Sequence, residues 1–270
     1  MKTRIIAAVA LLPLLLAIVL FAPKVCTAIL FALMAAVAAY ELLVGTGIEK
    51  SPRLVLYSAV MAVMTSLWSY FGWPGVWTQL LVLLFFVVLF AEIMMSGMKL
   101  PFFHVLACFA AGLLIPYLLT ALVRIHITSN GRFFILIPFA MAFLSDTGAY
   151  FFGLAFGKHK LAPTISPKKT VEGAVGGVVG AIVGMVLYCL VLQIFFDFTP
   201  NYIFALIYGI VGSVCAVFGD LCFSVIKRQT GIKDFGNLIP GHGGILDRFD
   251  SMVVVAPVAE ILLILLPLAV

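Results

Sequence analysis

The chain has 270 residues, of which 64% are hydrophobic and only 10% are charged, and its mean hydropathy is +1.26. This composition lies far outside that of soluble globular proteins. It therefore excludes an ordinary soluble enzyme or binding module and predicts an all-α, polytopic integral membrane protein. The formal net charge of +5 is compatible with membrane topology, with attraction to anionic lipid and with an anionic substrate.

Nine apolar runs are long enough to cross the hydrocarbon core, which requires roughly 20 residues of helix. Their approximate limits are 5–22, 25–45, 53–71, 75–96, 102–122, 133–156, 171–195, 201–225 and 251–269. Lys2 and Arg4 before the first run fit a secretory signal, but the many later spans favour an uncleaved first helix. Nine spans leave no room for a soluble domain.

Lysine and arginine are distributed unevenly between the two sides of this topology. With the N-terminus in the cytoplasm, only Lys24, Arg124 and Arg132 of the 16 basic residues lie outside. An excess of basic residues in cytoplasmic loops is the usual orientation signal. We therefore expect a multi-pass protein of the cell inner (cytoplasmic) membrane, with the polar motif loops 157–170 and 226–250 facing the cytoplasm.

The chain changes in character near residue 125. Residues 1–125 are hydrophobic with few polar features, and we interpret them as scaffold helices for lipid and dimer packing. Residues 126–270 carry nearly every unusual residue, so a catalytic region is expected there. The five cysteines lie in apolar runs without a CxxC pair, which indicates buried structural thiols (Cys26, Cys108, Cys189, Cys215 and Cys222).

Asp146 lies in the middle of the predicted sixth span, within the segment Ser145–Tyr150. A carboxylate at this depth costs about 2.5–3.5 kcal/mol on insertion scales, so it requires a reason. It is either hydrogen-bonded to a neighbouring helix as structural glue, or a ligand or orienter of a cation. The other polar residues of this half favour the cation.

The loop after this span places two lysines beside a helix start. Ser166 or Thr170 can cap the seventh span, where free N–H groups and the helix dipole attract phosphate. Lys168 and Lys169 add donors, so the segment is a candidate anion site, and the alternative is an ordinary cap with lysines that set the topology. Small residues four apart in the seventh span predict close helix packing within or between subunits (Gly173, Gly176, Gly177, Gly180 and Gly184).

Acidic residues recur near the cytoplasmic ends of the eighth and ninth spans. Asp220 lies in the eighth, and Asp247 and Asp250 share a face if their turn is helical. Together with Asp146, these carboxylates could converge at one depth. Oxygen ligands of this kind suit Mg²⁺, and four of them exceed what one such ion needs, so the set has room for a second cation.

The segment between the acids is rich in glycine, with Gly241, Gly243 and Gly244 around His242. Its backbone N–H groups can approach an oxyanion without side-chain obstruction. His242 either donates to a phosphate or caps the turn. Carboxylates for a divalent cation beside Lys and Arg match the needs of phosphoryl or nucleotidyl transfer, and at a bilayer surface the acceptor should be a lipid.

A long pattern joins these features. It runs Ser224-x-Ile226-Lys227-Arg228, four residues, Lys233-Asp234-x-Gly236, then Pro240-x-His242-Gly243-Gly244-x-x-Asp247-Arg248-x-Asp250. This pattern resembles the motif of phosphatidate cytidylyltransferases, also called CDP-diacylglycerol synthases, without departure at a fixed position. Segments 145–150 and 166–173 are similar to that family too. The resemblance implies Mg²⁺-dependent conversion of CTP and phosphatidic acid to CDP-diacylglycerol and pyrophosphate, and CTP comes only from the resemblance.

The resemblance and the residue chemistry together assign roles. The expected catalytic residues are Asp220, Asp247, Lys227, Arg228 and Asp250. The expected substrate-binding residues are Ser166, Lys168, Lys169, Ser224, Lys233, His242, Gly243, Gly244 and Arg248. The expected metal ligands are Asp220 and Asp247, with Asp146 and Asp250 supporting them or holding a second cation.

Two other classes of protein remain open. A secondary transporter for an organic anion would also keep intramembrane Asp and Gly-interrupted helices, but the first half has no counterpart to segment 224–250. A membrane scaffold gives no reason for these acids and bases. We therefore expect an enzyme whose partners are CTP, phosphatidic acid, membrane lipid and a second copy of the chain in a homodimer, with no nucleic acid.

Overall fold

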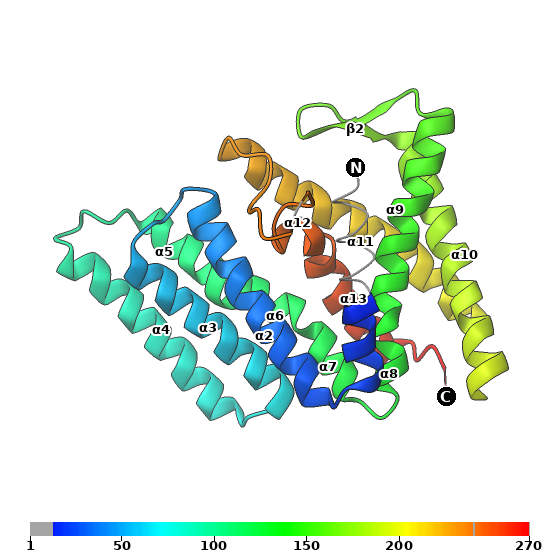
Figure 1. The fold of residues 1–270 in the computed structure, drawn as a ribbon, viewed down its shortest axis with the longest axis horizontal. Coiled ribbons are helices and arrows are strands. Elements are labelled where there is room, and N and C mark those ends of the chain that lie inside the picture. The colour runs from blue at the N-terminus through cyan, green and yellow to red at the C-terminus, as the bar shows by residue number, and fades with distance from the viewer. Residues whose placement is uncertain (1–12, 240, 270) are drawn as a thin grey trace. The chain divides into compact units, whose positions relative to one another are not determined.

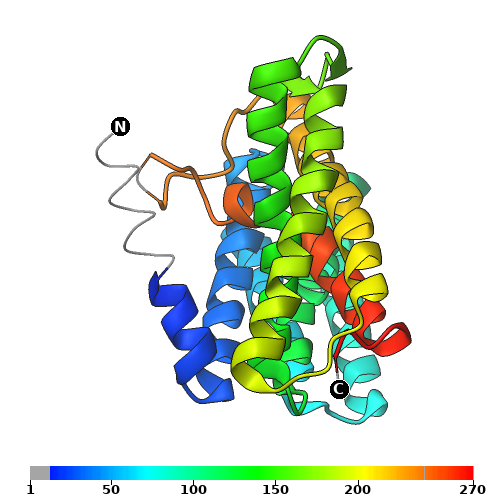
Figure 2. The same cartoon turned by 90° about the vertical axis from the view of Figure 1, so that its right-hand side faces the viewer.

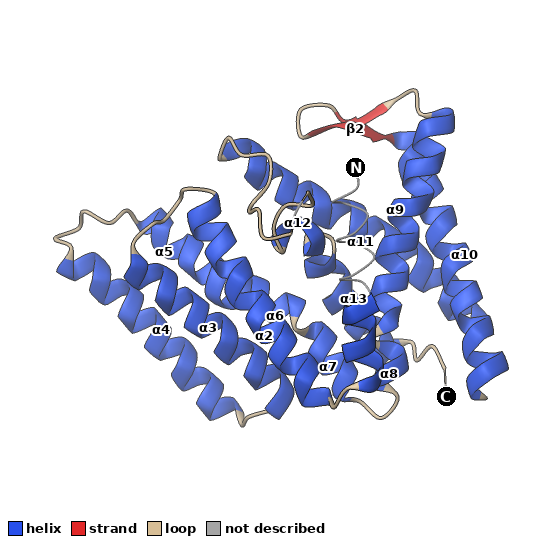
Figure 3. Ribbon diagram, in the orientation of Figure 1, coloured by secondary structure: helices blue, strands red, loops and turns tan. Residues whose placement is uncertain are grey.

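The computed structural model describes residues 13–239 and 241–269, and most of these residues are helical (Figures 1 and 3). Seven of the described helical segments are long and apolar enough to cross a membrane. They are Lys24–Gly45, Pro52–Phe71, Gly75–Met95, Phe102–Ile127, Gly131–Phe156, Val171–Phe196 and Tyr202–Gln229. The all-α, polytopic membrane class predicted from composition is therefore confirmed.

Two of the nine predicted spans are not among these seven. Run 5–22 lies partly outside the described residues, as do Lys2 and Arg4, although residues 13–21 are helical. Run 251–269 contains α13 (Met252–Leu265), an apolar helix of 14 residues that is shorter than a typical span. The count of nine and the cytoplasmic N-terminus stay predictions.

The described residues form two compact units. Unit 1 contains the residues up to Ser129 together with Gln229–Phe249, and unit 2 contains Asn130–Arg228 together with the residues from Asp250 onwards. The motif segment 226–250 is thus divided, because most of it folds with helices of the first half of the chain. The functional division near residue 125 stays a prediction.

Unit 1 is built from membrane-length helices and the motif segment. Its helices are α2 (Lys24–Tyr40), α3 (Pro52–Phe71), α4 (Gly75–Met95), α5 (Phe102–Phe109), α6 (Ile115–Leu119), α7 (Ala121–Ile127) and α12 (Leu246–Phe249). The π-helical turns η1 (Glu41–Gly45) and η2 (Ala110–Leu114) extend α2 and connect α5 to α6. Helices α2 and α3 pack side by side around the fully buried Phe31 and Ala35 (Figure 1). In α4 only Phe85 and Leu89 are buried.

Unit 2 consists of α8 (Gly131–Phe134), α9 (Leu136–Phe156), α10 (Val171–Phe196), α11 (Tyr202–Gln229) and α13. Helices α9 and α10 lie along each other over their length (Figure 2). Their closeness depends on glycine, because a Cβ atom on Gly180 would come within 2.6 Å of the Leu144 carbonyl oxygen and 3.0 Å of Gly148 Cα. The packing predicted for the seventh span is confirmed, within one chain.

A short antiparallel hairpin replaces the expected loop between α9 and α10. Strands β1 (Lys160–Ala162) and β2 (Ser166–Thr170) pair with Lys160 opposite Thr170 and Ala162 opposite Ser166. The segment Ser-Pro-Lys-Lys-Thr has no alternation of apolar and polar residues, so the sequence carried no strand signal. The hairpin lies at one end of the α9–α10 pair (Figure 2).

The cysteines are free thiols within helices. Cys108 and Cys189 are buried, whereas Cys26, Cys215 and Cys222 are partly exposed. The expectation of buried thiols is confirmed for Cys108 and Cys189 and is wrong for the other three, which are only partly buried.

Candidate active site

A cavity of about 380 Å³ in unit 2 brings together several of the predicted site residues. Asp146 comes from α9, and Lys168 and Lys169 come from β2. Leu154 and Leu161 contribute an apolar wall. The cavity therefore combines one acid, two bases and hydrocarbon surface, which is a suitable set of contacts for an amphiphilic anion.

Lys169 and Asp220 form an ion pair between β2 and α11. Both side chains are partly exposed, at 25% and 30%. The pair attaches the hairpin to α11 and holds an ammonium group against the predicted metal ligand. The predicted anion segment and the predicted acid of the eighth span are thus neighbours in the fold.

Asp250 is a second acid next to Asp220. Burial and the nearby carboxylate of Asp220 raise the pKa of Asp250 to about 7, and Lys227 opposes this shift. The two carboxylates are close because Gly219 has no side chain, since a Cβ there would lie 3.0 Å from the carbonyl oxygen of Asp250. Two neighbouring carboxylates that repel each other are a suitable donor set for a hard cation such as Mg²⁺.

The hairpin is held at two further points. Thr170 caps α10, because its Oγ1 accepts the N–H of Gly173 at 3.1 Å. The other predicted cap, Ser166, lies at the opposite end of β2 and does not cap the helix. At the hairpin turn, Nε of Arg228 donates to the Ile165 carbonyl at 3.1 Å. Arg228, predicted to bind phosphate, therefore also supports the hairpin that carries the two lysines.

The glycine-rich motif segment of unit 1 is closed on itself by hydrogen bonds. Asp247 is buried, and its Oδ2 accepts the N–H of Phe235 at 2.8 Å and of Gly244 at 2.9 Å. Gly243 has φ of +84°, and a Cβ there would come within 2.7 Å of that oxygen. Asp247 therefore organises the loop with one of its oxygens.

Two basic side chains of this loop differ in their surroundings. Nε of Arg248 donates to the His242 carbonyl at 2.9 Å. The Nδ1 atom of His242 is buried and, among the described residues, has no hydrogen-bond partner. A buried ring nitrogen of this kind requires a partner, and a bound phosphate oxygen would supply one.

Glu41 is a residue of this site region that the sequence analysis passed over. Its buried carboxylate accepts the backbone N–H groups of Ile245 at 3.0 Å and Leu246 at 2.9 Å. Glu41 could have been found from the sequence, because it is a single acid within a predicted apolar span. The cost of such an acid is the reason that Asp146 was identified.

The predicted residues thus fall into two groups. Unit 2 contains Asp146, Ser166, Lys168, Lys169, Asp220, Ser224, Lys227, Arg228 and Asp250. Unit 1 contains Lys233, His242, Gly243, Gly244, Asp247 and Arg248, while Pro240 of the motif lies outside the described residues. Within the described part of either unit, no three His, Cys, Asp or Glu side chains gather as ready metal ligands. The metal-ligand roles stay predictions.

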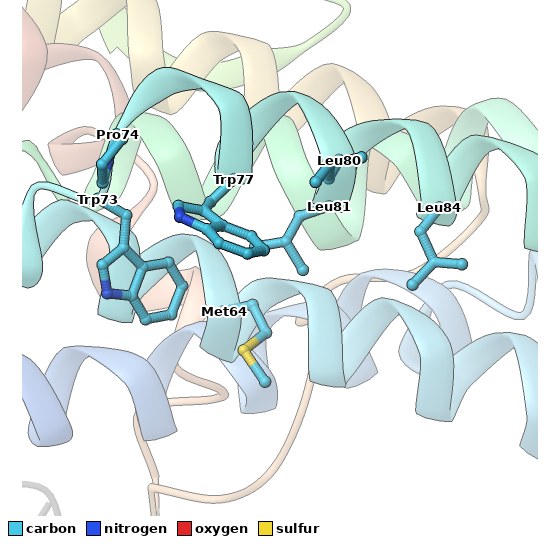
Figure 4. Close-up of a pocket in the computed structure, with 7 residues that line it drawn as sticks. All are labelled: Met64, Trp73, Pro74, Trp77, Leu80, Leu81 and Leu84. Carbon is cyan, nitrogen blue, oxygen red and sulfur yellow. The ribbon is translucent and has the colours of Figure 1, made fainter.

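A separate hollow of about 510 Å³ lies in unit 1 between α3 and α4 (Figure 4). Trp73 and Trp77 line it together with Met64 and leucines of α4. Every lining residue is apolar or aromatic. This hollow suits hydrocarbon and offers no group for phosphate chemistry.

Comparison with known proteins identifies relatives of the chain. A protein from Staphylococcus saprophyticus subsp. saprophyticus named phosphatidate cytidylyltransferase is 48% identical over 136 residues, which is 50% of this chain and 51% of that protein. Proteins of the same name from Staphylococcus epidermidis and Staphylococcus aureus are 48% and 45% identical over 136 and 141 residues. The matched segment spans about half the length of these relatives.

A family model described as "Cytidylyltransferase family" matches residues 2–266, nearly the whole chain. The resemblance seen in the motif segment is therefore confirmed at the level of the family. The chain belongs to the cytidylyltransferase family.

Proposed function

We propose that this chain is a phosphatidate cytidylyltransferase, which transfers the cytidylyl group of CTP to phosphatidic acid and releases pyrophosphate. The observation that carries the proposal is the cluster of Lys169, Asp220 and Asp250 beside the cavity lined by Lys168 and Asp146. The names of the relatives supply the nucleotide and the lipid. The product is CDP-diacylglycerol.

The chemistry requires positioning and charge neutralisation more than proton transfer. An oxygen of the lipid phosphate, already anionic at neutral pH, forms a bond to the α-phosphorus of CTP, and the bond from that phosphorus to the pyrophosphate oxygen breaks. Lys168 and Lys169 reduce the repulsion between the two anions, and we assign Lys227, Arg228, Lys233 and Arg248 to the same task. The apolar wall of Leu154 and Leu161 suits the lipid.

We propose Asp220 and Asp250 as ligands of Mg²⁺, with Asp146 as a supporting ligand. Asp247 is proposed as a further ligand from the family motif. When bound, Mg²⁺ would screen phosphate charge and help to orient the triphosphate. The Asp220–Asp250 contact supports this assignment: burial first, and then repulsion from Asp220, raise the pKa of Asp250, and a cation would relieve the repulsion between the two carboxylates. A second cation is a further proposal.

We place the active site at the cytoplasmic face of the plasma membrane, where CTP is available. The distribution of basic residues supports this orientation. A homodimer is proposed as well, supported by the nearly unburied apolar surface of α4, which suits either lipid or a second copy.

The test is a substrate panel with the purified chain in mixed micelles. We expect product only from CTP among the four ribonucleoside triphosphates, only with phosphatidic acid rather than diacylglycerol, and only with Mg²⁺ present. Turnover with diacylglycerol would identify a different transferase. The absence of turnover with every nucleotide would favour an anion transporter instead.

A further inference from the structure

Glu41 connects two segments of unit 1 that are more than 200 residues apart in sequence. It begins the π-helical turn η1 at the end of α2, and the residue is 3% exposed. One oxygen accepts the N–H of Ile245 and the other accepts the N–H of Leu246. A carboxylate inside an apolar helix is therefore used to bind the backbone of the motif segment.

Two glycines of the motif segment leave the space that this carboxylate occupies. A Cβ on Gly236 would come within 2.7 Å of Oε1 of Glu41, and a Cβ on Gly244 would overlap both oxygens. Neither glycine has a positive φ, so glycine is needed at these positions for space and not for backbone conformation. The backbone of Phe235 also lies directly against Gly45 of η1.

Glu41 and Asp247 satisfy complementary parts of the same loop. Asp247 accepts the N–H groups of Phe235 and Gly244, and Glu41 accepts those of the next two residues, Ile245 and Leu246. Four backbone donors are thus paired by two buried carboxylates. Buried N–H groups without partners are costly, so removal of either acid would let the loop leave this conformation.

We propose that Glu41 is a positioning residue for cytidylyl transfer, which fixes the turn that carries His242, Asp247 and Arg248. The proposal rests on the function proposed above. Glu41 does not touch the reacting atoms and acts through the backbone of residues 244–246. The first half of the chain then contributes to catalysis in addition to packing.

The matched control for Glu41→Gln is Glu49→Gln. Glu49 is also buried in unit 1: its Oε1 accepts the backbone N–H groups of Lys50 and Ser51 in its own turn, and its Oε2 contacts Nδ1 of His104 in α5 at 2.8 Å, so none of its partners belongs to the motif loop. A Gln amide in place of either acid keeps the volume and replaces one acceptor oxygen by a donor. The new amide group contacts the motif loop at position 41 but not at position 49.

We expect Glu41→Gln to lower kcat on the order of 100-fold per folded molecule, because small displacements of reacting groups have effects of this size. Hydrogen–deuterium exchange should rise in peptides that contain Ile245 and Leu246. Glu49→Gln should leave both readouts at the wild-type level. Wild-type kcat in folded Glu41→Gln, or unchanged exchange in the loop, would overturn the proposal.

Gly236→Ala perturbs the same contact while keeping the Glu41 carboxylate, so this single variant covers the case in which Glu41→Gln fails to fold, and a double-variant cycle extends it. Gly236→Ala pushes a methyl group against the carboxylate and should also lower kcat. In a Glu41→Ala background the same methyl group has space, so Gly236→Ala should cause no additional loss. A double variant whose loss of kcat equals the product of the two single losses would contradict the proposal. If the wild-type chain forms no CDP-diacylglycerol, the proposed function fails, and the exchange data still report whether Glu41 holds the loop.

Discussion

Carboxylates serve two different purposes in this chain. Glu41 and Asp247 accept backbone N–H groups and so stabilise a loop conformation. Asp220 and Asp250 instead lie next to each other, with Lys169 paired to Asp220. The neighbouring carboxylates of Asp220 and Asp250 repel each other, and such an arrangement suits a cation.

The sequence identified Asp220, Asp247 and Asp250 as site acids but not Glu41, and it did not show which acids hold a loop and which lie beside each other. The motif contains Asp247 and Asp250, and Asp220 was found separately by its position in the eighth span, because a sequence shows where acids lie and not which atoms they contact. Glu41 has its partners 204 and 205 residues away, so no local pattern connects it to the loop.

The first prediction concerns Asp220. Replacing it by Asn removes one charge from the cluster and keeps the shape, so we expect kcat to fall by about 10²–10³-fold, the usual effect of losing one stabilising group. Radiolabelled CDP-diacylglycerol formation in micelles measures this. Asp197→Asn is the control, because Asp197 ends α10 with φ of 55°, which Asn tolerates, and it lies outside the cavity. Equal activity of the two variants would remove Asp220 from the site.

At the scale of elements, the α9–α10 pair supports the cavity. Glycines bring the two helices close together, and the hairpin between them carries Lys168 and Lys169 to the cavity. The helices were predictable because their apolar runs are long. The hairpin was not, because its strands are short and its pairing depends on contacts such as Arg228 with Ile165.

The second prediction concerns this helix pair. In Gly180→Ala the new methyl group would meet the Leu144 carbonyl at 2.6 Å, and we expect a loss of about 1–3 kcal/mol in the free energy of unfolding. Gly75→Ala in α4 is the control, because nothing lies within 4 Å of its added Cβ. Thermal unfolding in one detergent compares the two. A Gly180→Ala protein as stable as the control would mean that the helices separate without cost.

At the scale of the whole molecule, composition predicted the membrane class correctly, because hydrophobicity summed over seven long helices is a strong signal. The division into two compact units was not apparent from the sequence. Residues 229–249 return to the unit of the first helices, and such long-range packing leaves no periodic pattern.

The third prediction concerns orientation. Ser129 and Lys160 are exposed and lie on opposite sides of the predicted topology. In a chain without its native cysteines, Ser129→Cys should react with a membrane-impermeant maleimide in intact cells, and Lys160→Cys only after permeabilisation. The reverse pattern would place the lysine-rich hairpin outside the cell, away from CTP.

In the proposed reaction, an oxygen of the lipid phosphate attacks the α-phosphorus of CTP. Phosphatidic acid labelled with ¹⁸O in its phosphate tests it directly, with mass spectrometry of both products. We predict that CDP-diacylglycerol retains all of the label, including the oxygen between its two phosphorus atoms, and that pyrophosphate carries none. Label in pyrophosphate, or loss of label to water, would contradict attack by the lipid phosphate.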